Sequence, residues 1–129
     1  MNLLDENIID SQRQRLCQWR IAIRHMGYDV ERQGMTDQEI LALLLGLRRS
    51  TFFTRDEDFY ARRLCHARYG LICLAVAKDE VVSFVRRLLR HPEFATVAKR
   101  RGTVIQASHV DLTVWRLHAA HATHVAWDT

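Results

Sequence analysis

Residues 51–60 of the chain are Thr-Phe-Phe-Thr-Arg-Asp-Glu-Asp-Phe-Tyr. The run of β-branched and aromatic residues from Thr51 to Thr54 is typical of a buried strand, and helix-like spacing of apolar residues resumes after it. Asp56 and Asp58 therefore lie where we expect a strand to give way to a helix. In open parallel sheets this edge, at the carboxyl ends of the strands, leaves a crevice where ligands bind. The two aspartates are accordingly the first candidates for a functional site.

Two further acids are expected at the same edge of the sheet. Asp5 follows the apolar run Met1-Asn-Leu-Leu4, and Asp37 begins a leucine-rich helix. Converging carboxylates repel one another unless a cation lies among them, and oxygen-rich sites suit Mg²⁺ or Mn²⁺. The natural chemistry of such a site is phosphodiester hydrolysis by metal-activated water. The candidate metal ligands and catalytic residues are Asp5, Asp37, Asp56 and Asp58.

Each of these acids also has a purely structural interpretation. Asp37 would favour the positive end of its helix, Asp56 would cap a helix, and Asp5 would be a turn residue. Glu39 forms half of a capping box with Thr36. A single acid is therefore weak support for a site, whereas four at one sheet edge are a stronger indication.

The expected elements alternate between strand and helix. Strands are expected over about 1–8, 28–30, 51–54 and 71–76, with one or two more over 103–115. Helices are expected from a cap at Asp10 or Ser11 to about His25, from the Thr36–Glu39 capping box through Leu47, over 57–68, from a cap at Asp79 to His91-Pro92, and over 93–101. The leucine-rich helix is apolar nearly all round, which predicts deep burial. The alternation predicts a three-layer α/β/α sandwich with a mainly parallel central sheet.

The composition indicates one domain over residues 1–129, with 116–129 expected as a loosely ordered tail. The chain is 48% hydrophobic, enough for a core. Its three cysteines lack paired spacing, which fits a reducing cytosol, and no apolar run approaches the roughly 18 residues of a membrane span. We therefore expect a soluble, cytoplasmic protein with no membrane partner. Histidines 118, 121 and 124 are spaced too evenly for a compact metal pair and are assigned to the tail.

Arginine dominates the basic residues. The net charge is +4, and the chain has 17 arginines beside Lys78 and Lys99. Arginine binds phosphate through two parallel hydrogen bonds and stacks on bases, so this bias points to nucleic acid. A solvated basic face has the same composition. Arg55 has the alternative role of offsetting the neighbouring carboxylates. The arginines expected to bracket the acidic strand end and to bind an RNA backbone are Arg48, Arg49, Arg55, Arg62 and Arg63, together with Arg68.

Three segments resemble the signature segments of PIN-like domains. They are Leu4-Asp5-Glu6-Asn7, Thr36-Asp37-Gln38-Glu39 and Thr54-Arg55-Asp56-Glu57-Asp58-Phe59. The likeness is greatest to short PIN-like proteins related to VapC-type toxins. It covers roughly residues 1–90 and extends more weakly to about 115.

The resemblance implies a metal-dependent endoribonuclease, the toxin of a toxin–antitoxin pair. In PIN domains an acidic quartet holds Mg²⁺ or Mn²⁺, and here it would consist of Asp5, Asp37, Asp56 and Asp58. Many VapC toxins carry glutamate at the second position, so Asp37 and Glu39 compete for that role. The resemblance also implies a homodimer silenced by a small antitoxin protein.

Two other functions are compatible with the same sequence. One is a catalytically inactive PIN-like module that binds RNA or a protein. The other is a phosphatase-like enzyme on a similar sheet, which is disfavoured because the five glycines are scattered and form no phosphate-cradling loop.

Overall fold

The computed structural model describes residues 1–27, 29 and 34–127. Its strands are β1 (Asn2–Leu4), β2 (Arg24–His25), β3 (Ser50–Thr54), β4 (Tyr69–Leu74), β5 (Thr103–Ala107), β6 (Asp111–Arg116) and β7 (Thr123–Ala126). Its helices are α1 (Asp10–Gln18), α2 (Asp37–Leu47), α3 (Val81–Arg90) and α4 (Val97–Arg100), with 3₁₀ turns η1 (Glu57–Phe59) and η2 (Arg62–Leu64). The strands form a seven-stranded sheet of order β2-β1-β3-β4-β5-β6-β7.

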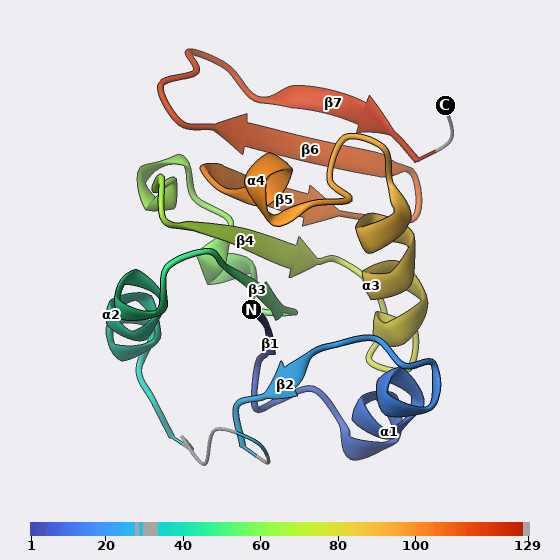
Figure 1. The fold of residues 1–129 in the computed structure, drawn as a ribbon. Helices are drawn as coiled ribbons and strands as arrows, with labels where there is room; N and C mark the ends of the chain where they lie inside the picture. The colour runs from blue at the N-terminus through green and yellow to red at the C-terminus, as the bar shows by residue number, and fades with distance from the viewer. Residues whose placement is uncertain (28, 30–33, 128–129) are drawn as a thin grey trace.

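The sheet is mainly parallel, as the alternation of elements predicts. The pairs from β2 to β5 are all parallel, and β6 and β7 extend the sheet by antiparallel pairing. Helices α1 and α3 pack on one face of the sheet, where their apolar side chains form one hydrophobic cluster. Helix α2 and the turns η1 and η2 pack on the other face, where they form a second cluster (Figure 1). The fold is therefore an α/β architecture compatible with three layers.

Several strands lie where the sequence predicts them. The predictions for β3 and β4 are confirmed, although β4 both begins and ends two residues earlier than expected. The stretch 103–115 forms two strands, β5 and β6. The C-terminal stretch assigned to a loosely ordered tail contains β7, which pairs with β6 from Thr123 to Ala126.

Helix α1 ends earlier than predicted, and β2 occupies residues assigned to it. Arg20 adopts a left-handed φ of 58°, while Ile21 N–H donates to the Leu16 carbonyl and Arg20 N–H to that of Cys17. This Schellman pattern normally uses glycine, so the sequence did not signal it. Neither Asp10 nor Ser11 caps the helix. The N-cap position is occupied by Ile9, which offers no side-chain hydrogen bond. The strand predicted at 28–30 falls mostly outside the described residues, and residue 29 lies in a turn.

The capping box of α2 is confirmed, but the deep burial predicted for this helix is wrong. Thr36 Oγ1 accepts from Glu39 N–H, and the Glu39 carboxylate accepts from Thr36 N–H. Only Ile40 and Leu44 of this helix are buried, and Leu47 is 38% exposed. The helix lies in an outer layer, so one face packs on the sheet while the other keeps its apolar residues at the surface (Figure 1).

The helix predicted over 57–68 is replaced by the turns η1 and η2. Phe59 and Leu64 are both buried against the sheet, with the Phe59 ring 5.3 Å from that of Phe52. Residues five positions apart point about 140° away from each other on a helix, so one helix would not bury both. Two separate turns do, and the Tyr69 hydroxyl donates to the Leu64 carbonyl at the end of η2.

The elements before β5 also differ in detail from the prediction. Helix α3 ends before His91-Pro92 as expected, but Asp79 does not cap it, since Glu80 occupies the N-cap position without a side-chain bond. The helical piece predicted over 93–101 is shorter and consists of α4, whose cap is Thr96. Within the described residues, no helix is long and apolar enough to cross a membrane.

Candidate metal site at the carboxyl edge of the sheet

Two neighbouring strands bring the acids together. β1 and β3 are parallel, with Leu4 opposite Phe53. Asp5 N–H continues this ladder by donating to the Phe53 carbonyl at 2.9 Å. Asp5 follows β1 directly, and Asp56 lies two residues beyond the end of β3. The chain therefore delivers both residues to the same edge of the sheet, as the sequence predicts.

Three of the four predicted acids form a close cluster. Carboxylate oxygens of Asp37, Asp56 and Asp58 lie within 4.8 Å of one another. Desolvation of the Asp37 carboxylate by the protein atoms around it raises the pKa of this group above its ordinary value. The negative charges of Asp56, Asp58 and Asp5 raise it further. Like charges at this separation favour either a proton or a cation. The cluster can therefore hold a divalent ion through oxygen ligands.

Asp5 lies behind this cluster rather than within it. Its side chain is 6% exposed, and its Oδ2 accepts from Thr54 Oγ1 at 2.6 Å. Thr54 Oγ1 in turn accepts from Asp56 N–H at 3.0 Å. One hydroxyl thus connects the buried acid to the loop that carries the exposed ones.

The loop after β3 is shaped by its own acids. Asp56 Oδ1 accepts from Asp58 N–H at 2.9 Å, which closes the first turn of η1. The cap proposed for Asp56 is therefore present, although it closes a 3₁₀ turn rather than an α-helix. The same contact holds Asp56 and Asp58 near each other, so the structural role and the cluster coexist.

Asp37 and Glu39 have different roles in the structure. The Glu39 carboxylate accepts from both Thr36 N–H and Thr36 Oγ1 in the capping box, whereas the Asp37 carboxylate belongs to the cluster. Asp37 is therefore the second acid of the candidate site. Glu6 lies elsewhere, where its carboxylate accepts from Gly34 N–H.

A hollow adjoins the cluster. It has a volume of about 330 Å³ and is lined by Asp37, Asp58, Gln38 and Arg63, with apolar side chains of η1, η2 and α2 completing the wall. Arg63 is exposed. It is the predicted RNA-binding arginine that lines the same hollow as the acids, so it is placed to meet an anionic ligand there.

The other predicted RNA-binding arginines have different surroundings. Arg55 Nε donates to the Val76 carbonyl at 2.9 Å. Arg62 donates to the Ala119 carbonyl and lies over the Trp115 ring. Arg48 and Arg49 precede β3, at the amino end of the strand, so they do not bracket the acidic edge.

Sequence reasoning did not single out Thr54 as a functional residue. The signal was a hydroxyl residue at the last position of a strand directly before the acids, where a side chain of one strand can reach the end of its neighbour. The C-terminal histidines do not join a metal cluster: within residues 1–27, 29 and 34–127, the three aspartates are the group of potential ligands that lies close enough to share an ion. His124 instead contacts the Asp111 carboxylate.

Comparisons with known proteins add no relative: no family model, no curated protein and no solved structure matches the chain. The fold and the site together define a class, an α/β protein with clustered carboxylates at the carboxyl edge of a mainly parallel sheet.

Proposed function

We propose that this protein is a PIN-like, Mg²⁺- or Mn²⁺-dependent endoribonuclease. The observation that carries the proposal is the cluster of Asp37, Asp56 and Asp58, whose carboxylate oxygens lie within 4.8 Å of one another. Asp5, tied to the same loop through Thr54, completes the acidic quartet that the PIN-like resemblance implies.

The donor set fits a hard divalent cation. All of the candidate ligands are carboxylates, which Mg²⁺ and Mn²⁺ accept readily while retaining waters and phosphate oxygens. Desolvation and, after it, the neighbouring negative charges raise the pKa of Asp37, and a cation would offset those charges. A divalent ion held there would polarise a phosphodiester and supply an activated water.

The side chains around the hollow have three different roles in this proposal. Asp37, Asp56 and Asp58 would hold a divalent ion beside the hollow, and Asp5 fixes the loop from behind through Thr54. Arg63 lines the same hollow and would bind a phosphate next to the scissile one. The proposed substrate is single-stranded RNA, whose flexible backbone can bring one phosphate to this hollow of about 330 Å³.

The PIN-like resemblance extends this proposal to partners. A homodimer and a small antitoxin protein that silences the site are part of it. A reading frame for a short protein beside this one would support the antitoxin.

RNA cleavage tests the proposal. Purified protein is incubated with a pool of end-labelled single-stranded RNA in Mn²⁺, in Mg²⁺ and in EDTA. Cleavage is expected with metal only, and it should be lost in Asp56→Asn and Asp5→Asn but retained in Asp79→Asn, which removes an exposed acid outside the cluster. Intact RNA under every condition, with RNA still bound, would favour the inactive binding module.

A further inference from the structure

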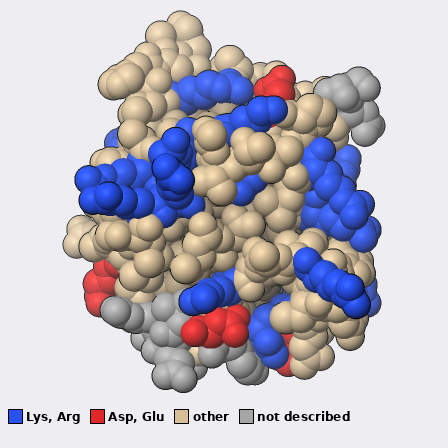
Figure 2. Space-filling model, in the orientation of Figure 1, with Lys and Arg blue, Asp and Glu red and all other residues tan. Residues whose placement is uncertain are grey.

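Basic side chains gather at the opposite edge of the sheet from the acids. The connection from α2 to β3, the start of β4, the turn from α4 to β5 and the end of β6 all meet there. Figure 2 shows basic side chains beside the start of β4 and over the end of β6. The exposed residues of this basic edge are Arg48, Arg49, Arg68, Lys99, Arg101 and Arg116.

A buried arginine adds to the positive charge of this edge. Arg100 is 3% exposed, and its guanidinium donates to three neutral acceptors: Thr51 Oγ1, the Phe94 carbonyl and Asn2 Oδ1. Within the part of the chain that the structure describes, it forms no ion pair with a carboxylate. Burial of this charge lowers the pKa of Arg100. Arg100 therefore adds a buried positive charge beneath the basic edge, with no carboxylate partner among the described residues.

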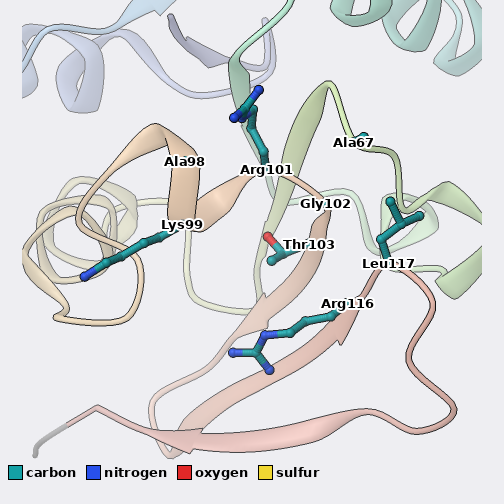
Figure 3. A pocket seen from close by; sticks show the side chains of 8 residues that line it. All are labelled: Ala67, Ala98, Lys99, Arg101, Gly102, Thr103, Arg116 and Leu117. Atoms are coloured by element: carbon teal, nitrogen blue, oxygen red, sulfur yellow. The ribbon is translucent and has the colours of Figure 1, made fainter.

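Three of these exposed cations, Lys99, Arg101 and Arg116, line a hollow of about 480 Å³ between the α4–β5 turn and the end of β6. Lys99 and Arg116 extend to the same side of the turn, whereas Arg101 extends in another direction (Figure 3). The charges line the hollow without converging on one point. That arrangement suits a chain of spaced phosphates better than one compact anion, which needs donors aimed at a single centre.

Lys99 and Arg116 are engaged in contacts within the protein, whereas the side chain of Arg101 is available to a ligand. Lys99 Nζ donates to the Pro92 carbonyl, and Arg116 contacts Thr123 and the Glu93 carboxylate. Arg101 is exposed and makes no side-chain hydrogen bond or ion pair with the described residues. It is therefore the side chain whose removal tests the hollow with the least disturbance to the fold.

Basic and aromatic groups continue from this edge toward the acids. Trp115 precedes Arg116 in β6, and the Arg62 guanidinium lies 5.3 Å from the centre of its ring. Arg62 begins η2, and Arg63 beside it lines the hollow at the acidic cluster. β3 separates the two edges by five residues, roughly 16 Å of strand. A single-stranded RNA of several nucleotides spans that length.

We propose that the hollow around Arg101, Lys99 and Arg116 binds backbone phosphates of a single-stranded RNA whose other part reaches the acidic cluster. This inference rests on the proposed function for the identity of the RNA as substrate. It adds a second anchoring site at the far edge of the sheet.

The test is RNA binding in EDTA, where no metal-dependent cleavage interferes. Fluorescence anisotropy with a labelled, mixed-sequence single-stranded RNA of about 20 nucleotides gives Kd over a range of salt concentrations, for wild type, Arg101→Gln and Arg15→Gln. Arg15 is the control because it is exposed on α1 and lines neither this hollow nor the one at the acidic cluster. Lys99→Gln is a second variant of the hollow, and thermal melts verify folding.

The expected result follows from counterion release. Each lost single-strand phosphate contact lowers the salt slope by about 0.7, which amounts to about fivefold in Kd at about 0.1 M salt. Arg101→Gln and Lys99→Gln should each show this loss, and Arg15→Gln should bind like the wild type. Equal weakening by Arg15→Gln, no weakening by Arg101→Gln, or no RNA binding at all would overturn the proposal.

The outcome is separable from that of the nuclease proposal. If no RNA is cleaved but Arg101→Gln weakens binding with the smaller salt slope, the second anchoring site stands and the nuclease proposal fails. If RNA is cleaved while Arg101→Gln binds like the wild type, the nuclease proposal stands and the second site is wrong.

Discussion

The hydroxyl of Thr54 donates to the carboxylate of Asp5 at 2.6 Å, across 49 positions of the chain. Thr54 is fully buried and Asp5 is 6% exposed. The same hydroxyl accepts from Asp56 N–H. One side chain therefore fixes the end of β1 to the loop after β3, and with it the relative position of the acids on the two strands.

Replacing Thr54 by valine removes this connection without changing the shape of the side chain. The buried carboxylate of Asp5 and the Asp56 N–H each lose a partner, so Thr54→Val should lower the free energy of unfolding by about 1–3 kcal/mol. Urea denaturation measures the change. Thr54→Ser keeps the hydroxyl and is the control; a Thr54→Val protein as stable as wild type would show that the hydrogen bonds contribute little.

Asp37 should make stability depend on pH and on metal. Because its folded-state pKa is raised, the protonated carboxyl stabilises the fold below the ordinary value of 3.8, and this contribution is lost as pH rises through the folded pKa. In EDTA at neutral pH, Asp37→Asn should therefore be more stable than wild type, and the difference should vanish at low pH. Mn²⁺ should reverse the ranking, because the variant loses a ligand. Thermal melts at several pH values test both halves, and a variant less stable than wild type in EDTA would contradict the first.

Gly70 in β4 should not tolerate a side chain. A Cβ at this position would lie 2.5 Å from the Arg100 carbonyl oxygen, a backbone atom. Gly70→Ala should consequently destabilise the fold by about 1–3 kcal/mol, through a shift of β4 against α4. Gly46→Ala is the matched control, because nothing lies within 4 Å of its Cβ position and alanine favours a helix. Chemical denaturation of both variants should show changes of opposite sign, and a loss no larger for Gly70→Ala than for Gly46→Ala would contradict this account.

Arg20 carries a backbone conformation that glycine adopts at lower cost. Its φ of 58° closes α1, and the left-handed region costs a residue with a side chain about 1–2 kcal/mol. Arg20→Gly should raise the melting temperature, offset in part by the greater freedom of glycine in the unfolded chain. Arg15→Gly, in the helix interior, should lower it. A melting temperature of Arg20→Gly at or below that of Arg15→Gly would show that the left-handed end does not limit this helix.

The sequence was most informative where one local pattern had one structural outcome. The apolar run before Asp56 predicts β3, the Thr36–Glu39 capping box predicts the start of α2, and the placement of Asp5 after a first strand predicts its edge of the sheet. These features depend on neighbours in the chain and on the general rule that parallel strands end together. The cluster of Asp37, Asp56 and Asp58 follows from them.

The sequence was least informative where tertiary packing overrides a local preference. The stretch 57–68 has helical composition, but burying both Phe59 and Leu64 requires two turns. Arg48 and Arg49 are close to Asp56 in the sequence but lie at the other end of β3, because five residues of extended chain separate them from it. The role of Thr54 depends on which strands are neighbours, and spacing along the chain does not give that order.

Direct binding of Mn²⁺ to the purified, metal-free protein is the sharpest test of the acidic cluster. Electron paramagnetic resonance counts free Mn²⁺ as protein is added, for the wild type, Asp56→Asn and Asp79→Asn. Wild type and Asp79→Asn should each bind one ion per chain at the cluster, and Asp56→Asn should bind it at least about tenfold more weakly. Undiminished binding by Asp56→Asn, or no binding by the wild type, would contradict a metal site built from these aspartates.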